Sequence, residues 1–184
     1  MRSDMSEIAD HSAARDVAQS RRRAPAPTRY QLDIIGSHVA DVVDAAGGWL
    51  FDRVMAGWDV NVAVPEGCDV RPLQILGVRT VSMDAILADA NTSTSSALAV
   101  SGRLCSHDDR ITEAVAAAVR SGRREVTVWG ELWVTALGRR GEQVRHELSA
   151  AARAFKAHAV ASAGVGQSAM AGFEAFRSHG LWGG

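Results

Sequence analysis

The densest group of side chains able to do chemistry is the run Cys105-Ser106-His107-Asp108-Asp109. A thiolate and an imidazole can share a zinc ion or work as a nucleophile and its base. A serine with an acid three places on is also typical of a helix start, and capping explains Ser106, Asp108 and Asp109 without a ligand. Capping is the favoured interpretation, and Cys105, His107 and Asp108 are retained as candidate ligand-binding residues.

A second candidate group, Cys68-Asp69, lies in the loop Pro65-Glu66-Gly67-Cys68-Asp69, directly after a predicted strand. Ligands of open α/β sheets bind outside the carboxyl ends of the strands, so this loop is well placed. Cys68 would need surroundings that favour its thiolate to act as a nucleophile, whereas a neighbouring carboxylate, here Asp69, disfavours a thiolate. No C-x-x-C or H-x-x-x-H spacing is present, so the sequence predicts no metal site.

The glycine-rich stretch AGGWLFDRVMAGWDVNVAV (46–64) raises the question of a cofactor site. A dinucleotide fingerprint needs its glycines after a strand and at the start of a helix, and here they precede the strand. No Walker-type G-x-x-x-x-G-K-[ST] exists either, so no cofactor is predicted. The apolar stripe of this segment passes unbroken through Gly47-Gly48, which predicts one helix over 37–56 or two short helices. A glycine pair inside a helix suggests close approach by another backbone.

Tryptophans form the third group of candidates. If 125–137 is one extended strand, Trp129 and Trp133 lie on one face and can stack on a sugar or base, although core packing is favoured. Trp182 lies in the glycine-rich C-terminus, where it either docks on a partner or folds back onto the domain. Trp129, Trp133 and Trp182 are therefore candidate partner-binding residues.

These residues must be positioned by helices that alternate with valine-rich strands. Strands are expected at 58–64, 77–82, 97–101 and from 125. Helices are expected at 37–56, 84–90, 110–121 and 142–160, and the last twenty residues are weakly helical. The pattern predicts a small layered α/β domain with a mainly parallel sheet of about four strands flanked by helices. The alternative is an α+β fold in which 124–137 forms a C-terminal hairpin against helix 142–160.

Composition bounds the organisation of the chain. Its 184 residues, 47% hydrophobic and 22% charged, fit one α/β domain over 28–179, with a disordered N-terminal tail (1–27) and a flexible C-terminal tail (180–184). Lys156 is the only lysine, and the arginine bias indicates a GC-rich bacterial source. No signal peptide or membrane anchor is recognised, so a cytoplasmic protein with reduced cysteines is expected.

The function expected from these features is that of a non-catalytic binding or regulatory module, acting through contacts with another protein or through self-association. The alternative is a small-ligand-binding protein or an enzyme that uses the strand-end loops 65–71 and 102–109. Nucleic-acid binding through Arg21–Arg23 and Arg139-Arg140 is least favoured, because the net charge of −1 provides no basic face.

Overall fold

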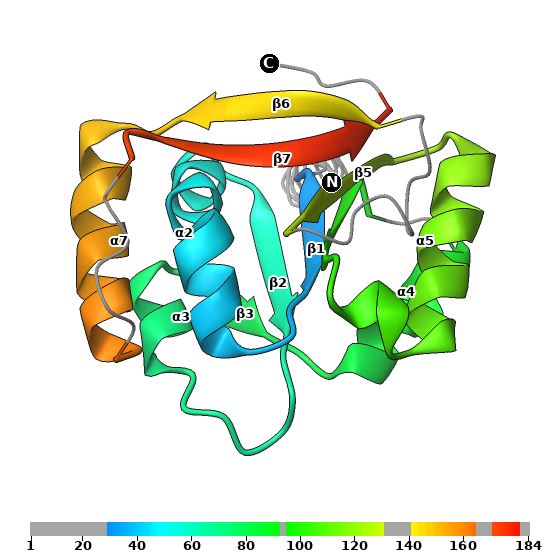
Figure 1. The fold of residues 1–184 in the computed structure, drawn as a ribbon, viewed down its shortest axis with the longest axis horizontal. Coiled ribbons are helices and arrows are strands. Elements are labelled where there is room, and N and C mark those ends of the chain that lie inside the picture. Colours follow the sequence, from blue (N-terminus) through cyan, green and yellow to red (C-terminus); the bar gives the residue numbers. More distant parts are fainter. Residues whose placement is uncertain (1–28, 93–94, 131–140, 165–170, 181–184) are drawn as a thin grey trace, which may run out of the picture.

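The computed structural model describes residues 29–92, 95–130, 141–164 and 171–180. They form a seven-stranded sheet in the order β3-β2-β1-β4-β5-β7-β6 (Figure 1). The first five strands are parallel, and β7 runs antiparallel to both β5 and β6. The strands are β1 (Gln31–Ile35), β2 (Asp59–Ala63), β3 (Arg79–Thr80), β4 (Ala97–Ser101), β5 (Glu125–Trp129), β6 (Glu142–Glu147) and β7 (Phe173–His179).

Helices cover both faces of this sheet, and each side has its own hydrophobic cluster. One face carries α2 (Val39–Met55), α3 (Arg71–Ile75) and α7 (Ala150–Ser162), and the other carries α4 (Met83–Thr92) and α5 (Asp109–Ser121) (Figure 1). A single 3₁₀ turn, η2 (Leu104–Ser106), follows β4. No helix in the described part of the chain is long and apolar enough to cross a membrane.

The prediction of a layered α/β fold with a mainly parallel sheet is confirmed, but the sheet has seven strands rather than about four. One missed strand is β1, whose residues after Gln31 are all buried. Both faces of a parallel sheet are covered by helices, so such a strand lacks the alternation by which strands are recognised. The short strands β2, β4 and β5 all lie where the sequence predicted them.

The C-terminal part departs most from the prediction. The segment predicted as one helix over 142–160 is the strand β6 followed by α7, and Ser149 caps α7 by accepting from the Ala152 N–H (3.0 Å). β6 is a polar, largely exposed edge strand, and such strands carry little hydrophobic signal. The weak helix expected near the C-terminus is the strand β7, which alternates in burial. The alternative hairpin 124–137 falls largely on residues 131–140, outside the described residues.

The glycine pair of α2 lies against side chains rather than against another backbone. A Cβ atom on Gly48 would lie 2.5 Å from Leu148 Cδ2, whereas one on Gly47 would make only an ordinary 3.4 Å contact with Leu76. α2 is continuous from Val39 to Met55, which confirms the one-helix prediction, and it ends before Gly57 at φ +85° as expected.

The same turn of α2 receives a buried ion pair. The carboxylate of Glu174 on β7 accepts from the backbone N–H groups of Gly48 (2.9 Å) and Trp49 (2.8 Å). Lys156 Nζ on α7 donates to this carboxylate (2.6 Å) and to the backbone carbonyl of Asp44 (2.5 Å). In a regular helix the Asp44 carbonyl is the acceptor of the Gly48 N–H, so the pair engages both groups of one helical hydrogen bond. Burial raises the pKa of Glu174, and the lysine and the two N–H groups oppose that shift.

The two glycines should respond oppositely to alanine. Gly48→Ala should lower the free energy of unfolding by about 1–3 kcal/mol, because its Cβ overlaps Leu148. Gly47→Ala should be neutral or stabilising by up to about 1 kcal/mol, because alanine favours the helix and the space exists. Urea denaturation of both variants measures this, and equal losses would contradict the packing described.

Removing Glu174 should be far more damaging than removing an exposed glutamate. Glu174→Ala leaves the Lys156 ammonium buried without its counter-charge, and such a change costs about 3–5 kcal/mol. Glu142→Ala, an exposed position on the neighbouring strand β6, serves as the control and should change stability by no more than about 0.5 kcal/mol. Chemical denaturation at neutral pH compares them, and similar losses would show that the pair contributes little.

Candidate functional site

A cavity opens at the carboxyl end of the sheet, between β1 and β4. The chain leaves β1 toward α2 on one face and leaves β4 toward η2 and α5 on the other, so the connections diverge between these two neighbouring strands. Ligands of open α/β sheets bind at such a switch point. We call this cavity the switch-point pocket. It has a volume of about 340 Å³ and is lined by Ser37, His38, Ala40, Asp41, Asp44 and Arg103.

Gly36 brings the start of α2 close to the end of β1. Its N–H donates to the Ala63 carbonyl (2.9 Å), and a Cβ there would lie 2.1 Å from Val42 Cγ2. His38 follows as the extended N-cap residue of α2, and its exposed imidazole makes no capping hydrogen bond. The imidazole is therefore positioned at the pocket without a structural role in the helix start.

Asp41, in the first turn of α2, is the most firmly held functional side chain of the pocket. Its Oδ2 accepts from Ser37 Oγ (2.7 Å), and its Oδ1 accepts from the indole Nε1–H of Trp129 (3.3 Å). The two donors come from the ends of β1 and β5. Hydrogen bonds to both oxygens fix the direction of the carboxylate, and each oxygen keeps a lone pair for a ligand.

Arg103 supplies the positive charge of the pocket from the other side of the crevice. It lies in the loop after β4, its side chain is exposed, and its backbone carbonyl lies 2.8 Å from His107 Nδ1. The pocket thus combines a guanidinium with the carboxylates of Asp41 and Asp44 and the imidazole of His38. This set suits a small polar ligand rather than an apolar one.

Of the two predicted loops, only 102–109 borders this pocket, through Arg103. His107 is exposed beside Arg103, and Asp108 is the N-cap of α5, where it accepts from the Arg110 N–H (2.9 Å). The Arg110 side chain holds the pKa of Asp108 below its usual value. Capping is thus observed for Asp108, as the favoured interpretation predicted, although Ser106 is not the N-cap.

The two cysteines do not converge. Cys68 packs on the hydrophobic cluster under α2, and Cys105 is buried in the cluster under α5, on the opposite face of the sheet. Asp69 is paired with Arg71 on the surface. Within the described ranges, no three His, Cys, Asp or Glu side chains lie together so as to hold a metal ion. Ligand binding by Cys68, Asp69, Cys105, His107 and Asp108 stays a prediction.

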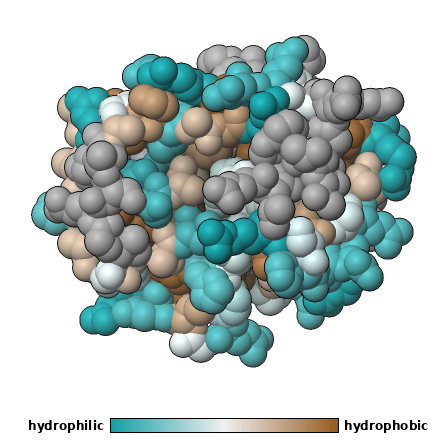
Figure 2. Space-filling model, viewed as in Figure 1, coloured by the Kyte–Doolittle hydropathy of each residue, from teal (hydrophilic) through white to brown (hydrophobic). Residues whose placement is uncertain are grey.

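Of the three candidate tryptophans, only Trp129 lies within the residues that the structure describes. Trp129 is 2% exposed and packs in the core, where its indole also holds Asp41. Trp133 and Trp182 lie outside the described residues. The large hydrophobic side chains exposed on the described surface are Tyr30, Met55 and Phe155, and on the face seen in Figure 2 polar residues are interspersed with apolar ones.

Sequence reasoning missed Ser37, His38, Asp41 and Arg103 as site residues. Their signal was positional: polar residues directly after a buried strand and in the first turn of the next helix. The signal of Ser37, His38 and Asp41 was hidden because β1 itself was not recognised, whereas Arg103 lies in the predicted loop 102–109 but was not singled out.

Comparison with known proteins yields likeness in fold. No family model matches, and no curated protein matches in sequence. Several solved structures do match. A triple mutant of the deacetylase Orf2 of the teicoplanin biosynthetic pathway has a TM-score of 0.57 at 14% identity, over 80% of this chain and 97% of that one. A zinc-inhibited form of teicoplanin deacetylase Orf2 has a TM-score of 0.53 at 15% identity, over 71% and 82%. The A40926 pseudoaglycone deacetylase Dbv21 has a TM-score of 0.53 at 15% identity, over 72% and 81%.

These likenesses overturn one expectation from the sequence. A non-catalytic, regulatory protein-binding module was expected, and this expectation is wrong, because the solved structures that share the fold are deacetylase enzymes. The alternative expectation, a small-ligand-binding protein or an enzyme, agrees better with them. At 14–15% identity the likeness shows the fold, so the activity of this chain must be argued from its own pocket.

The contrasting positions of the cysteines predict a difference in reactivity. Burial raises the pKa of Cys105 to about 11, so at pH 8 it is a protonated, inaccessible thiol, whereas Cys68 is half-buried in a loop. The folded protein should release about one equivalent of thionitrobenzoate from Ellman's reagent, and the second only on unfolding. Two rapid equivalents in the folded protein would contradict this arrangement.

Proposed function

We propose that this protein is a small-molecule hydrolase that removes an acyl group from a polar substrate bound in the switch-point pocket. The observation that carries the proposal is the carboxylate of Asp41, held by two donors beside the imidazole of His38 and opposite Arg103. The fold shared with deacetylases supports the reaction class.

The pocket offers the groups that such a hydrolysis needs. Water attacks the acyl carbonyl carbon, and Asp41 or His38 accepts its proton as the new C–O bond forms. The bond to the leaving nitrogen or oxygen then breaks as that atom takes up a proton. Arg103 holds a negatively charged or carbonyl oxygen of the substrate, and the N–H groups of the first turn of α2, which have no acceptor within the helix, can support the developing oxyanion.

The proposal assigns no metal ion to this pocket. His38 and Asp41 are two of the side-chain types that bind zinc, and Asp44 also lines the pocket, but in the part of the chain that the structure describes no three such side chains lie close enough together to hold a metal ion. The proton transfers are therefore assigned to side chains alone.

The test is a deacylation screen of the full chain. N-acetylated and O-acetylated amino sugars and simple acyl amines are incubated with the protein, and released acetate and free amine are measured. Asp41→Asn and His38→Ala should each lower kcat/KM about 10²–10⁴-fold, the range of general acid–base contributions. Arg103→Ala should mainly raise KM.

Two matched variants control for unspecific effects. Asp109 also lies in the first turn of a helix but outside the pocket, and His158 is exposed on α7, so Asp109→Asn and His158→Ala should leave activity unchanged. Full activity in Asp41→Asn would contradict the assigned role. Absence of deacylation, with no substrate raising the melting temperature, would overturn the proposed function.

A further inference from the structure

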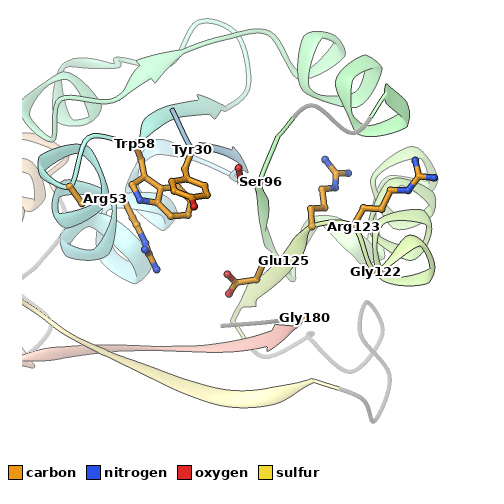
Figure 3. A pocket seen from close by; sticks show the side chains of 10 residues that line it. Tyr30, Arg53, Trp58, Ser96, Gly122, Arg123, Glu125 and Gly180 are labelled. Atoms are coloured by element: carbon orange, nitrogen blue, oxygen red, sulfur yellow. The ribbon is translucent and has the colours of Figure 1, made fainter. Parts of the chain in front are cut away.

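A second cavity, about 550 Å³, lies at the opposite edge of the sheet, where the parallel strands begin (Figure 3). We call it the amino-edge pocket. It is bordered by the starts of β1, β2, β4 and β5, the last turn of α2 and the end of β7. The switch-point pocket lies at the other ends of these strands, so the two cavities share no lining residue.

One wall of this pocket is aromatic. Tyr30 and Trp58 stack with ring centroids 5.1 Å apart and planes at 26° (Figure 3). The Arg53 guanidinium lies 4.5 Å from the Trp58 ring centroid and contributes a cation–π contact. Tyr30 is 64% exposed, so one side of its ring is open to solvent. Its outer face can take a further flat ring at the same spacing.

The facing wall is cationic. Arg123 is exposed, and Arg124, next to it, is only 5% exposed. Arg124 Nη1 donates to Ser95 Oγ (3.1 Å), but its buried Nη2 has no hydrogen-bond partner in the described residues. Asp33 is the acidic group that acts on Arg124 at longer range, and its carboxylate already accepts from Asn61 (2.9 Å). A buried cation with an unsatisfied donor is costly unless an anion lies near it.

The amino-edge pocket carries more positive charge than is needed to complement the dipoles of the helices that end there. The carbonyl ends of α2 and α5 both face this edge, and each has an arginine in its last turn, Arg53 and Arg120, which complements the helix dipole. Arg123 and Arg124 follow Gly122, beyond the end of α5. Glu125 offsets one charge, since its carboxylate points toward Arg53 across the pocket in Figure 3.

We propose that the amino-edge pocket binds a small anion that carries a flat ring, such as a nucleoside monophosphate or an aromatic carboxylate. The ring stacks on Tyr30, and the exposed Arg123 side chain turns inward to hold the oxyanion, which the charge of the buried Arg124 also attracts. The backbone around the pocket is fixed by sheet hydrogen bonds, including Asp59 N–H to the Tyr30 carbonyl (2.9 Å) and Glu125 N–H to the Ser96 carbonyl (3.2 Å), so the frame that carries these side chains is preorganised. This site is independent of the proposed hydrolase function.

Calorimetric titration of the full chain with four probes tests the proposal. Adenosine monophosphate and benzoate each combine a ring with an oxyanion, whereas adenosine and inorganic phosphate each supply one part. Adenosine monophosphate or benzoate should bind saturably, with a Kd about tenfold lower than the Kd of adenosine or of inorganic phosphate. Preference between the two combined probes identifies the ligand source. No saturable binding, or phosphate alone binding as tightly as the combined probes, would overturn the proposal.

Two arginine variants separate a specific site from general charge attraction. Arg123→Ala should weaken binding at least about tenfold, as expected for loss of a charge-assisted contact. Arg120→Ala removes the same charge three residues away, outside the lining, and should leave the affinity unchanged. Equal losses in the two variants would contradict the site.

Tyr30→Ala tests the aromatic wall and should weaken the ring-bearing probes while leaving the response to phosphate unchanged. The melting temperature of each variant checks folding. Deacylation by Arg123→Ala should match the parent protein, so failure of this site and failure of the hydrolase proposal remain distinguishable.

Discussion

The ion pair between Lys156 and Glu174 is the contact on which the rest of the structure depends. It joins α7 and β7, late in the chain, to the middle of α2 through hydrogen bonds to backbone groups of that helix. A buried ion pair adds little stability over well-packed apolar side chains. Its value here is geometric, because it bonds to three defined backbone groups and so permits one position of α2.

That position matters because α2 connects the two candidate sites. Its first turn presents His38 and Asp41 to the switch-point pocket, and its last turn presents Arg53 to the amino-edge pocket. Gly36 and Gly48 let the helix lie close to β1 and to Leu148. The glycines of this segment therefore serve packing, and the packing holds the functional side chains at both ends of the helix.

The elements that could be predicted from the sequence are those with a strong local period or a local stop. Helix α5 combines a regular apolar stripe with the cap Asp108 and the left-handed Gly122, and all three signals lie within a short window. β1 and β6 could not be recognised, since a strand buried on both faces and a polar edge strand both lack alternation. The site was missed with β1, because His38 and Asp41 have meaning only as residues that follow a central strand.

The sequence by itself determined the fold class, the alternation of helices with parallel strands, and the helix ends at Gly57 and Gly122, because short-range periodicity and backbone conformation encode these. Only the tertiary structure decided that Lys156 would donate to a backbone carbonyl of α2. The same holds for the separation of the two cysteines by the sheet and for the contact by which Trp129 orients Asp41. The partners in the contacts of Glu174 with α2 and of Trp129 with Asp41 are 88 to 126 residues apart. Such contacts follow from strand order and helix packing, which no local pattern records.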